Sequence, residues 1–297
     1  MTPEDLLGLA RDGDLEVVGA YRAQVADAVR VFAEAGDAAS ALELVGRAWR
    51  IWFTRAELDE GSAVAAVALT APSATAVPVW RARALYADGM FAFRSGDGER
   101  ALERNQEALR IARETDDARG ECDALTGLAR IALRDGRYDQ VIVLARQGRE
   151  RARAMGDREA EASPLHLQAA GVRLQQDYSA ARTLYLESLA LNTELGNTAW
   201  VAMELDCLGW VELHLGDVDA AEARFRERDA RAGTDPYAAA WRDMTWAAVA
   251  IARGETDEAK RRFAAGTSAF AELGAELDPD DQAEVDWVKG QLERPSD

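Results

Sequence analysis

A forty-residue internal repeat is the feature that most limits what this chain can fold into. Turn-forming residue pairs recur at positions 96, 136, 176 and 216, at intervals of 40 residues, and once more at 254 after 38. A small residue stands seven positions before each turn, and a small apolar residue stands five positions after it. The first column is Gly89, Ala129, Ala169, Gly209 and Ala247, and the second is Ala101, Val141, Ala181, Ala221 and Ala259. Such a period is typical of helical repeat architectures, in which neighbouring units bury each other's apolar faces.

Each repeat unit is expected to fold as a helix, a tight turn, a second helix and a loop. The small columns let paired helices approach closely, because large side chains there would hold the backbones apart. The pairs Ser163-Pro164, Asp235-Pro236 and Asp278-Pro279 predict helix starts at their prolines. No segment alternates apolar and polar residues between hairpin turns, so no β-sheet is predicted. The prediction is an all-α solenoid of about seven antiparallel helix pairs with a C-terminal capping helix.

The regularity of the repeat divides the chain into three expected parts. Residues 1–76 are expected to form divergent N-terminal helix pairs, and residues 77–275 to form five regular repeats. Residues 276–297 are expected to form a C-terminal capping helix and a tail, since acidic side chains give this segment the polar face that a solenoid end needs. The longest stretch of helix-breaking residues, at 70–79, is a candidate hinge between the first two parts.

The first part carries its own local signals. Thr2-Pro3 predicts the start of a short helix, because threonine is a common cap and proline fits the first helical position. After a turn at Gly13-Asp14, a long helix is expected to run to about Ala35. The following helix carries two tryptophans three residues apart, Trp49 and Trp52, which we interpret as core residues.

The composition excludes several classes of partner. The formal net charge is −18, with 53 acidic against 35 basic residues, and such a surface repels nucleic-acid phosphates. No stretch approaches the roughly 18 consecutive apolar residues of a membrane helix, and no leader signal is seen, so a cytoplasmic protein without membrane contact is expected. Cys122 and Cys207 lie within apolar helical patterns and are expected to be buried free thiols. Abundant arginine and alanine are typical of a GC-rich bacterial genome.

The units and the segment before them resemble known families. With their Gly-Asp turn and following alanine, the units resemble the tetratricopeptide repeat in a longer form. Together with the run GDAASALELVGRAWRIWF at residues 36–53, they resemble the C-terminal repeat region of large actinobacterial LuxR-type and antibiotic-regulator ATPases. The sequence has no Gly-x-x-x-x-Gly-Lys-Ser/Thr loop and no recognisable helix-turn-helix end. The resemblance therefore implies a right-handed superhelix that serves sensing or partner binding, without the ATPase and the DNA reader.

The same resemblance implies a binding groove, because the first helix of each tetratricopeptide pair lines the concave surface. The predicted groove residues are Arg83, Tyr86, Met90, Phe93, Arg94, Asp123, Thr126, Arg130, Arg134, His166, Arg173, Met203, Asp206, Trp210, His214, Trp241 and Met244. This set holds five arginines and both histidines of an acidic chain, so the groove is expected to be positive and aromatic. Its arginines would fork onto carboxylates of an acidic peptide, and its aromatic side chains would supply apolar anchors.

Each of these interpretations has a structural alternative. An arginine on a helix also serves as a solvated residue or as a partner for a carboxylate on the next helix. Trp210 and Trp241 also fit a role in packing between neighbouring repeats. His166 and His214 lie a whole repeat apart without convergent cysteine or carboxylate spacing, so neither a metal site nor a cofactor is expected.

The residues give little support to catalysis. No serine sits in a nucleophile turn and no cysteine stands beside a histidine in a recognisable motif, so an enzyme is not expected. The preferred hypothesis is a regulatory protein–protein interaction module or scaffold that holds a peptide or protein segment, acidic in part, in the groove. Two alternatives stay open: a small-molecule sensor domain of a system like a transcriptional regulator, and a scaffold that self-associates into homo-oligomers.

Overall fold

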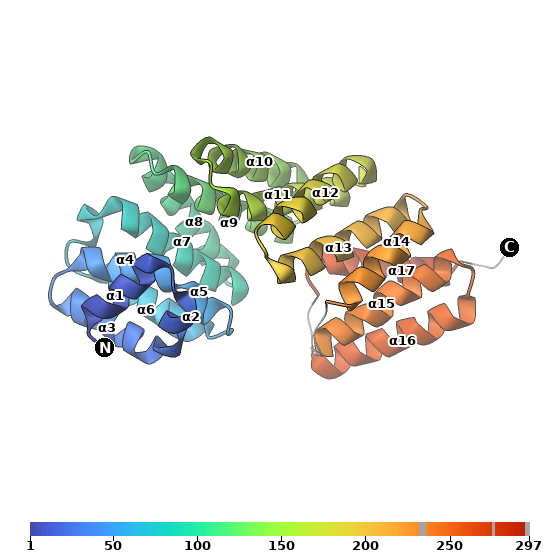
Figure 1. The fold of residues 1–297 in the computed structure, drawn as a ribbon, viewed down its shortest axis with the longest axis horizontal. Helices are drawn as coiled ribbons and strands as arrows, with labels where there is room; N and C mark the ends of the chain where they lie inside the picture. Colours follow the sequence, from blue (N-terminus) through green and yellow to red (C-terminus); the bar gives the residue numbers. More distant parts are fainter. Residues whose placement is uncertain (232–235, 275–276, 295–297) are drawn as a thin grey trace. The chain divides into compact units, whose positions relative to one another are not determined.

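The structure is helical throughout the residues that it describes, as the repeat predicted. A computed structural model gives the positions of residues 1–231, 236–274 and 277–294 (Figure 1). None of these residues lies in a β-strand, and helices that follow each other in the chain pack in neighbouring pairs. No helix in these ranges is long and apolar enough to span a membrane. The chain divides into two compact units: unit 1 comprises residues 1–131 and 147–160, and unit 2 comprises residues 132–146 and 161–297.

Six helices form the irregular start of unit 1. They are α1 (Pro3–Asp12), α2 (Leu15–Ala20), α3 (Arg22–Glu34), α4 (Ala38–Ala48), α5 (Arg50–Phe53) and α6 (Leu58–Thr70). The predicted cap at Thr2 is confirmed, because its hydroxyl accepts a hydrogen bond from the Asp5 amide at 3.2 Å. The Asp5 carboxylate in turn accepts one from the Thr2 amide at 2.9 Å. This reciprocal pair satisfies two amides that the first helical turn leaves without partners.

The single long helix predicted up to about Ala35 is wrong. The backbone leaves helical geometry at Tyr21, with φ −108° and ψ 28°, so α2 ends there and α3 begins. With the bend in place, Val18 of α2 and Val25 of α3 are both fully buried. A straight helix over this length would have to keep all its apolar residues on one stripe, whereas the bend lets two short helices turn theirs into one core.

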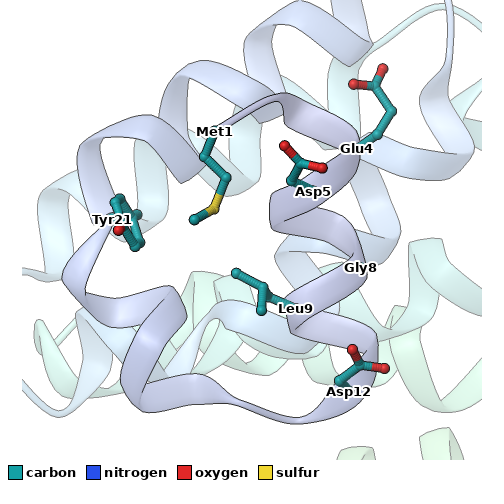
Figure 2. A pocket seen from close by; sticks show the side chains of 7 residues that line it. All are labelled: Met1, Glu4, Asp5, Gly8, Leu9, Asp12 and Tyr21. Atoms are coloured by element: carbon teal, nitrogen blue, oxygen red, sulfur yellow. The ribbon is translucent and has the colours of Figure 1, made fainter.

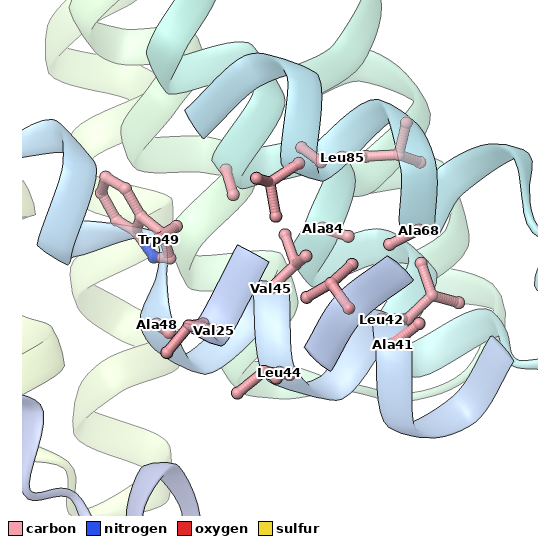
Figure 3. Close-up of a cluster of buried hydrophobic side chains, with 14 of the residues drawn as sticks. Val25, Ala41, Leu42, Leu44, Val45, Ala48, Trp49, Ala68, Ala84 and Leu85 are labelled. Carbon is pink, nitrogen blue, oxygen red and sulfur yellow. The ribbon is translucent and has the colours of Figure 1, made fainter. Parts of the chain in front are cut away.

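The two tryptophans predicted as core residues are buried in unit 1, which confirms that interpretation. Figure 3 shows Trp49 near Ala48, at one edge of a cluster that also contains Ala84 and Leu85 of the first regular helix, α7 (Pro78–Arg94). The Trp49 ring meets Tyr86 edge to face, with centroids 5.6 Å apart, and Phe91 at 6.3 Å. Trp52 is fully buried. The aromatic side chains thus join the irregular helices to the first repeat.

Ten further helices follow the forty-residue period in five pairs. They are α7 with α8 (Gly98–Glu114), α9 (Ala118–Arg134) with α10 (Tyr138–Met155), α11 (Arg158–Leu174) with α12 (Tyr178–Glu194), α13 (Thr198–His214) with α14 (Val218–Asp229), and α15 (Pro236–Ala252) with α16 (Thr256–Leu273). A last helix, α17 (Pro279–Leu292), follows them. Residues 70–79 connect α6 to α7 through a 3-10 turn (Ala74–Ala76) inside unit 1, and their role as a hinge stays a prediction.

The predicted turns lie between the two helices of each pair. The glycines of four turns, at positions 96, 136, 216 and 254, adopt left-handed backbone conformations with φ between 69° and 83°. Gln176 holds the same position in the third pair with φ 65°. Three of the turns are followed by an aspartate whose carboxylate accepts an amide hydrogen bond of the next helix: Asp97, Asp177 and Asp217. The turn residues therefore both reverse the chain and cap the second helix.

The helix start predicted at Pro164 is wrong. α11 begins six residues earlier, where the Asp157 carboxylate accepts a hydrogen bond from the Ala160 amide at 2.9 Å. Proline inside a helix has no N–H for the carbonyl four residues before it, which here is that of Ala160. The Cys122 thiol donates to this carbonyl at 3.7 Å, so the carbonyl keeps a partner. The predicted starts at Pro236 and Pro279 are confirmed, although Asp235 lies outside the described residues.

Candidate functional site

In unit 1, the predicted groove arginines of α7 are already bonded to neighbouring helices. The Arg83 guanidinium holds Asp117, just before α9, through Nε at 3.2 Å and Nη2 at 2.8 Å. Arg94 donates to the Phe53 carbonyl at 2.5 Å, and its guanidinium lies 4.9 Å from the centroid of the Phe53 ring. These two side chains therefore follow the alternative in which arginines join adjacent helices.

The other predicted residues of α7 contribute mainly to the core. Tyr86 and Met90 are buried, and Phe93 is half-buried against the same cluster of apolar side chains. Burial raises the pKa of the Tyr86 hydroxyl to about 12, and the nearby Asp123 carboxylate raises it further. The hydroxyl therefore stays protonated at neutral pH, where it can donate a hydrogen bond but cannot act as a base.

Asp123 of α9 lies among several guanidinium groups. Nε of Arg119 lies 3.3 Å from each of its carboxylate oxygens, while Nη1 of the same side chain bonds Asp157 at 2.7 Å. Burial raises the pKa of Asp123, and the charges of Arg119, Arg50 and Arg83 oppose that rise. Arg50 and Arg119 were not among the residues predicted from the sequence. Arg119 stands one helical turn before Asp123, a spacing that could have revealed it, whereas Arg50 lies outside the regular repeats.

The remaining predicted residues of α9 differ in burial. Thr126 is buried, and its hydroxyl donates to the Cys122 carbonyl of the same helix at 2.8 Å. Arg130, in unit 1, and Arg134, in unit 2, are both half-buried. The Thr126 hydroxyl is therefore bonded within its own helix, while the two arginine side chains are partly exposed.

In unit 2, His166 of α11 joins a buried polar network. Its Nδ1 atom lies 3.0 Å from a carboxylate oxygen of Glu204 on α13, and the Ser188 hydroxyl of α12 donates to the same oxygen at 2.7 Å. Glu204 has no solvent-exposed surface. The network ties three successive helices together, since a buried carboxylate is stable only with partners of this kind. Neither Glu204 nor Ser188 was among the residues predicted from the sequence.

Asp206 of α13 is the centre of a second polar network. Trp241 of α15 donates to its carboxylate through Nε1 at 2.9 Å, and Arg228 of α14 forms an ion pair with it. Burial raises the pKa of Asp206, and Arg228 is the main opposing charge. Arg228 also donates to the Thr245 hydroxyl at 2.9 Å. Asp206 is thus bonded across three helices of adjacent repeats.

The predicted aromatic anchors of unit 2 pack between repeats. Trp210 is 1% exposed, and its ring lies 5.9 Å from both Phe225 and Trp241, measured between centroids. Met244 is buried in the same cluster, whereas Met203 is 47% exposed. This arrangement follows the alternative in which the tryptophans stabilise the stacking of neighbouring pairs.

Helix α17 brings carboxylates to the first helices of unit 2. Arg173 of α11, only 4% exposed, forms an ion pair with Glu284 and a second one with Asp280 at 3.3 Å. The second oxygen of Glu284 lies 2.8 Å from Nε2 of His214 on α13. Tyr237 of α15 donates its hydroxyl hydrogen to Asp281 at 2.8 Å. One short helix thus bonds to the first helices of three consecutive pairs.

Aromatic and apolar contacts accompany these bonds. The Trp287 ring of α17 lies 5.1 Å from the His214 ring and 6.4 Å from Trp210, both edge to face. Tyr178 stacks on His214 at 4.3 Å. Val288 is fully buried in the cluster that contains Trp210 of α13 and Trp241 of α15. We call the four side chains that receive α17 the α17-contact surface: Arg173, Trp210, His214 and Tyr237.

Comparisons with known proteins place the fold. No protein family model matches the chain, and no curated protein matches it either. Among solved structures, the apo form of RapI has a TM-score of 0.64 at 14% identity, covering 91% of this chain and 96% of that one. A Rap protein in complex with competence and sporulation factor has a TM-score of 0.63 at 14% identity, covering 98% and 85%. A tetratricopeptide repeat protein from Parabacteroides merdae has a TM-score of 0.53 at 13% identity, covering 90% and 98%.

The chain has a tetratricopeptide-like fold. Identities this low establish the architecture alone. Within this tetratricopeptide-like chain, the structure brings three of the predicted groove residues, Arg173, Trp210 and His214, together on one surface of unit 2. The sequence predicted α17 as a capping helix, but its side chains also lie on the positions predicted to receive a ligand.

The described residues also form hollows away from this surface. The first, of about 660 Å³ in unit 1, has apolar walls formed by Met1, Leu9 and Tyr21 and an acidic side that includes Asp5 and Asp12 (Figure 2). The second, of about 320 Å³, is lined in part by Glu121, whose carboxylate is paired with Arg113 and Arg151. Within the described residues, no three histidine, cysteine or acidic side chains gather as metal ligands would.

Proposed function

We propose that this chain is a regulatory protein-interaction module without catalytic activity, which binds a peptide or helical segment on its first helices. The same fold occurs in a Rap protein whose structure was solved with competence and sporulation factor, which supports a role in binding. The resemblance of residues 36–53 and the repeats to LuxR-type and antibiotic-regulator ATPases supports the regulatory part. We further propose that the protein is cytoplasmic and bacterial.

The chemistry of the two thiols supports the non-catalytic part of this proposal. Burial raises the pKa of Cys122 to about 12 and also raises that of Cys207. Both thiols therefore stay protonated at neutral pH, whereas a cysteine nucleophile acts as its thiolate. The Cys122 thiol is also bonded to the Ala160 carbonyl, as a structural side chain would be.

The observation that carries the proposal is that the first helices of unit 2 already hold a helical segment. Arg173 receives two carboxylates of α17, and His214 and Trp210 receive its indole ring. These are the interactions that we expect for an acidic peptide: guanidinium groups on carboxylates and aromatic side chains as anchors. The surface is thus chemically suited to a helical ligand.

A peptide-display selection on the immobilised full-length chain tests this function. Enriched peptides are synthesised, and their sites are mapped by hydrogen exchange of the full-length chain. We expect protection on first helices, from α7 to α15, and acidic residues among the enriched sequences. The variant Arg110→Glu serves as a control, because Arg110 is exposed on α8, a second helix. This substitution should leave the affinity of the chain for the enriched peptides unchanged.

Negative results of the selection, and two further measurements on the same chain, distinguish the proposal from its alternatives. Protection confined to second helices, or no enrichment at all, contradicts the proposal. A concentration-dependent mass without peptide binding indicates a self-associating scaffold. Stabilisation by members of a metabolite panel, again without peptide binding, indicates a small-molecule sensor.

A further inference from the structure

Helix α17 reaches further than an end cap needs to. In a solenoid each unit contacts its neighbours, so a cap has only the last pair to cover. Part of α17 does this, since Val288 is fully buried in the cluster around α15 and Asp281 accepts a hydrogen bond from Tyr237 of α15. Other side chains of the same helix reach α13 and α11: Trp287 and Glu284 contact α13, and Glu284 lies against Arg173 of α11, 111 residues earlier in the chain. Figure 1 shows α17 as the red helix beside α15.

The additional contacts are polar and buried. Arg173 and Glu284 are each only 4% exposed, and His214 completes the partners of the same carboxylate. Burying an ion pair removes both charges from water, and apolar side chains of the same volume often stabilise a fold equally well or better. Contacts of this kind are therefore weak evidence for a role in stability, and their charges restrict which helix the surface accepts. A helix that only caps the solenoid end does not require such specificity.

Three of the contacting side chains of α17 follow one helical spacing. Asp280, Glu284 and Trp287 stand at positions i, i+4 and i+7, and such positions share one face of a helix. The carboxylates of this face meet Arg173 and His214, and its indole meets His214 and Trp210. The face therefore defines the chemistry of a helix that the surface accepts.

We propose that the α17-contact surface of unit 2 binds a helix of another protein, and that α17 occupies this surface in the resting chain. The partner helix carries carboxylates at positions i and i+4 and a tryptophan or similar aromatic residue at i+7, and it binds after displacing α17. This inference rests on the proposed function and specifies its partner class. A tethered helix competes at an effective concentration in the millimolar range, so α17 sets a threshold that the partner must exceed.

The test uses the full-length chain and a fluorescent peptide with the sequence of residues 278–293, whose binding is followed by anisotropy. The chain variant Glu284→Lys places a cation beside Arg173 and releases α17. Asp286→Lys makes the same charge change at an exposed position of the same helix and is the control. We expect Glu284→Lys to bind the peptide about tenfold or more tightly than wild type. Asp286→Lys should bind it as weakly as wild type does.

Hydrogen exchange separates release of α17 from unfolding. In Glu284→Lys, the amides of α17 should lose protection while those of α11 and α13 keep it. A peptide that itself carries Glu284→Lys should not bind, and Arg173→Gln in the released chain should weaken binding of the unmodified peptide.

Two results would overturn the inference. One is a chain whose α17 is released but which binds the peptide no better than wild type. The other is dimerisation of Glu284→Lys, seen as a doubled mass, which would identify a second copy as the occupant. If displayed peptides bind other first helices while the 278–293 peptide fails to bind the chain with released α17, the proposed function holds and only the inference is lost.

Discussion

The imidazole Nε2 of His214 lies 2.8 Å from the Glu284 carboxylate, although 70 residues separate them in the chain. His214 ends the first helix of the fourth repeat, and Glu284 belongs to the helix that follows the fifth. The sequence analysis predicted both segments but not their contact. This contact makes the C-terminal helix part of the candidate binding surface.

We predict that docking of α17 weakens as the pH rises from about 4 to about 8. Burial raises the pKa of Asp281 from its ordinary value of 3.8 to about 8, and the Asp280 carboxylate contributes. Asp206 acts in the same direction, whereas Arg173 and the Tyr237 hydroxyl oppose the rise. Between these pH values, the docked helix retains a proton that the free helix has released, so each rise in pH favours release.

Urea unfolding at a series of pH values measures this effect. At its steepest, the contribution of one retained proton is about 1.4 kcal/mol per pH unit. Asp281→Asn removes the titrating group, so the variant should lose stability less steeply than wild type over this range. Equal slopes for the two proteins would show that Asp281 does not titrate with docking.

Gln176→Gly should raise the free energy of unfolding by about 1 kcal/mol. Gln176 has φ 65° in a turn where four other repeats place glycine, and a side chain with a Cβ atom is strained in this conformation. Chemical denaturation measures the gain. Gly136→Gln makes the reverse change at the equivalent turn, where φ is 69°, and should lower stability by a similar amount. A neutral result for both substitutions would contradict this account of the turn.

Glu204→Ala should lower the free energy of unfolding by about 3 kcal/mol, because it leaves buried partners without an acceptor. Those partners are the Ser188 hydroxyl, at 2.7 Å, and His166, at 3.0 Å. Glu204→Gln keeps an acceptor for Ser188 and should cost clearly less. A double-mutant cycle with Ser188→Ala measures the coupling between the two side chains, and strict additivity would show that the network is not cooperative.

The fold was predictable from the sequence because its determinants recur. Glycine at 96, 136, 216 and 254 marks turns, and the small columns mark where helices approach, so five copies of one signal support each other. The start assigned to Pro164 shows the limit of a local signal. The apolar periodicity of α11 and the cap at Asp157 outweigh the proline, whose missing bond is compensated by the Cys122 thiol.

The candidate site was predictable only in its first-helix half. A repeat period locates residues such as Arg173 on equivalent positions of every unit, but it says nothing about where a non-repeating helix docks. Glu284 meets Arg173 over 111 residues, and no local pattern encodes that distance. The carboxylate Asp117 was not predicted either: it lies between two repeat units, just before α9, and no local pattern indicates its pairing with Arg83, 34 residues earlier.

Gly209→Ala should lower the free energy of unfolding by about 1–2 kcal/mol. A Cβ atom at position 209 would lie 2.3 Å from the ring of Phe225, which is fully buried and packs edge to face on Trp210. Overpacking of this kind costs about 1–3 kcal/mol, from which the higher helix propensity of alanine subtracts up to about 1 kcal/mol.

Gly290→Ala is the matched control, because among the described residues nothing apart from the neighbouring backbone of α17 itself lies within 4 Å of the added methyl group. Only the propensity contributes there, so this variant should be more stable than wild type by up to about 1 kcal/mol. Combining Gly209→Ala with Phe225→Leu should recover part of the loss, since the smaller side chain gives the methyl group room. If Gly209→Ala is stabilising like the control, helices α13 and α14 do not approach as closely as the small-residue columns require.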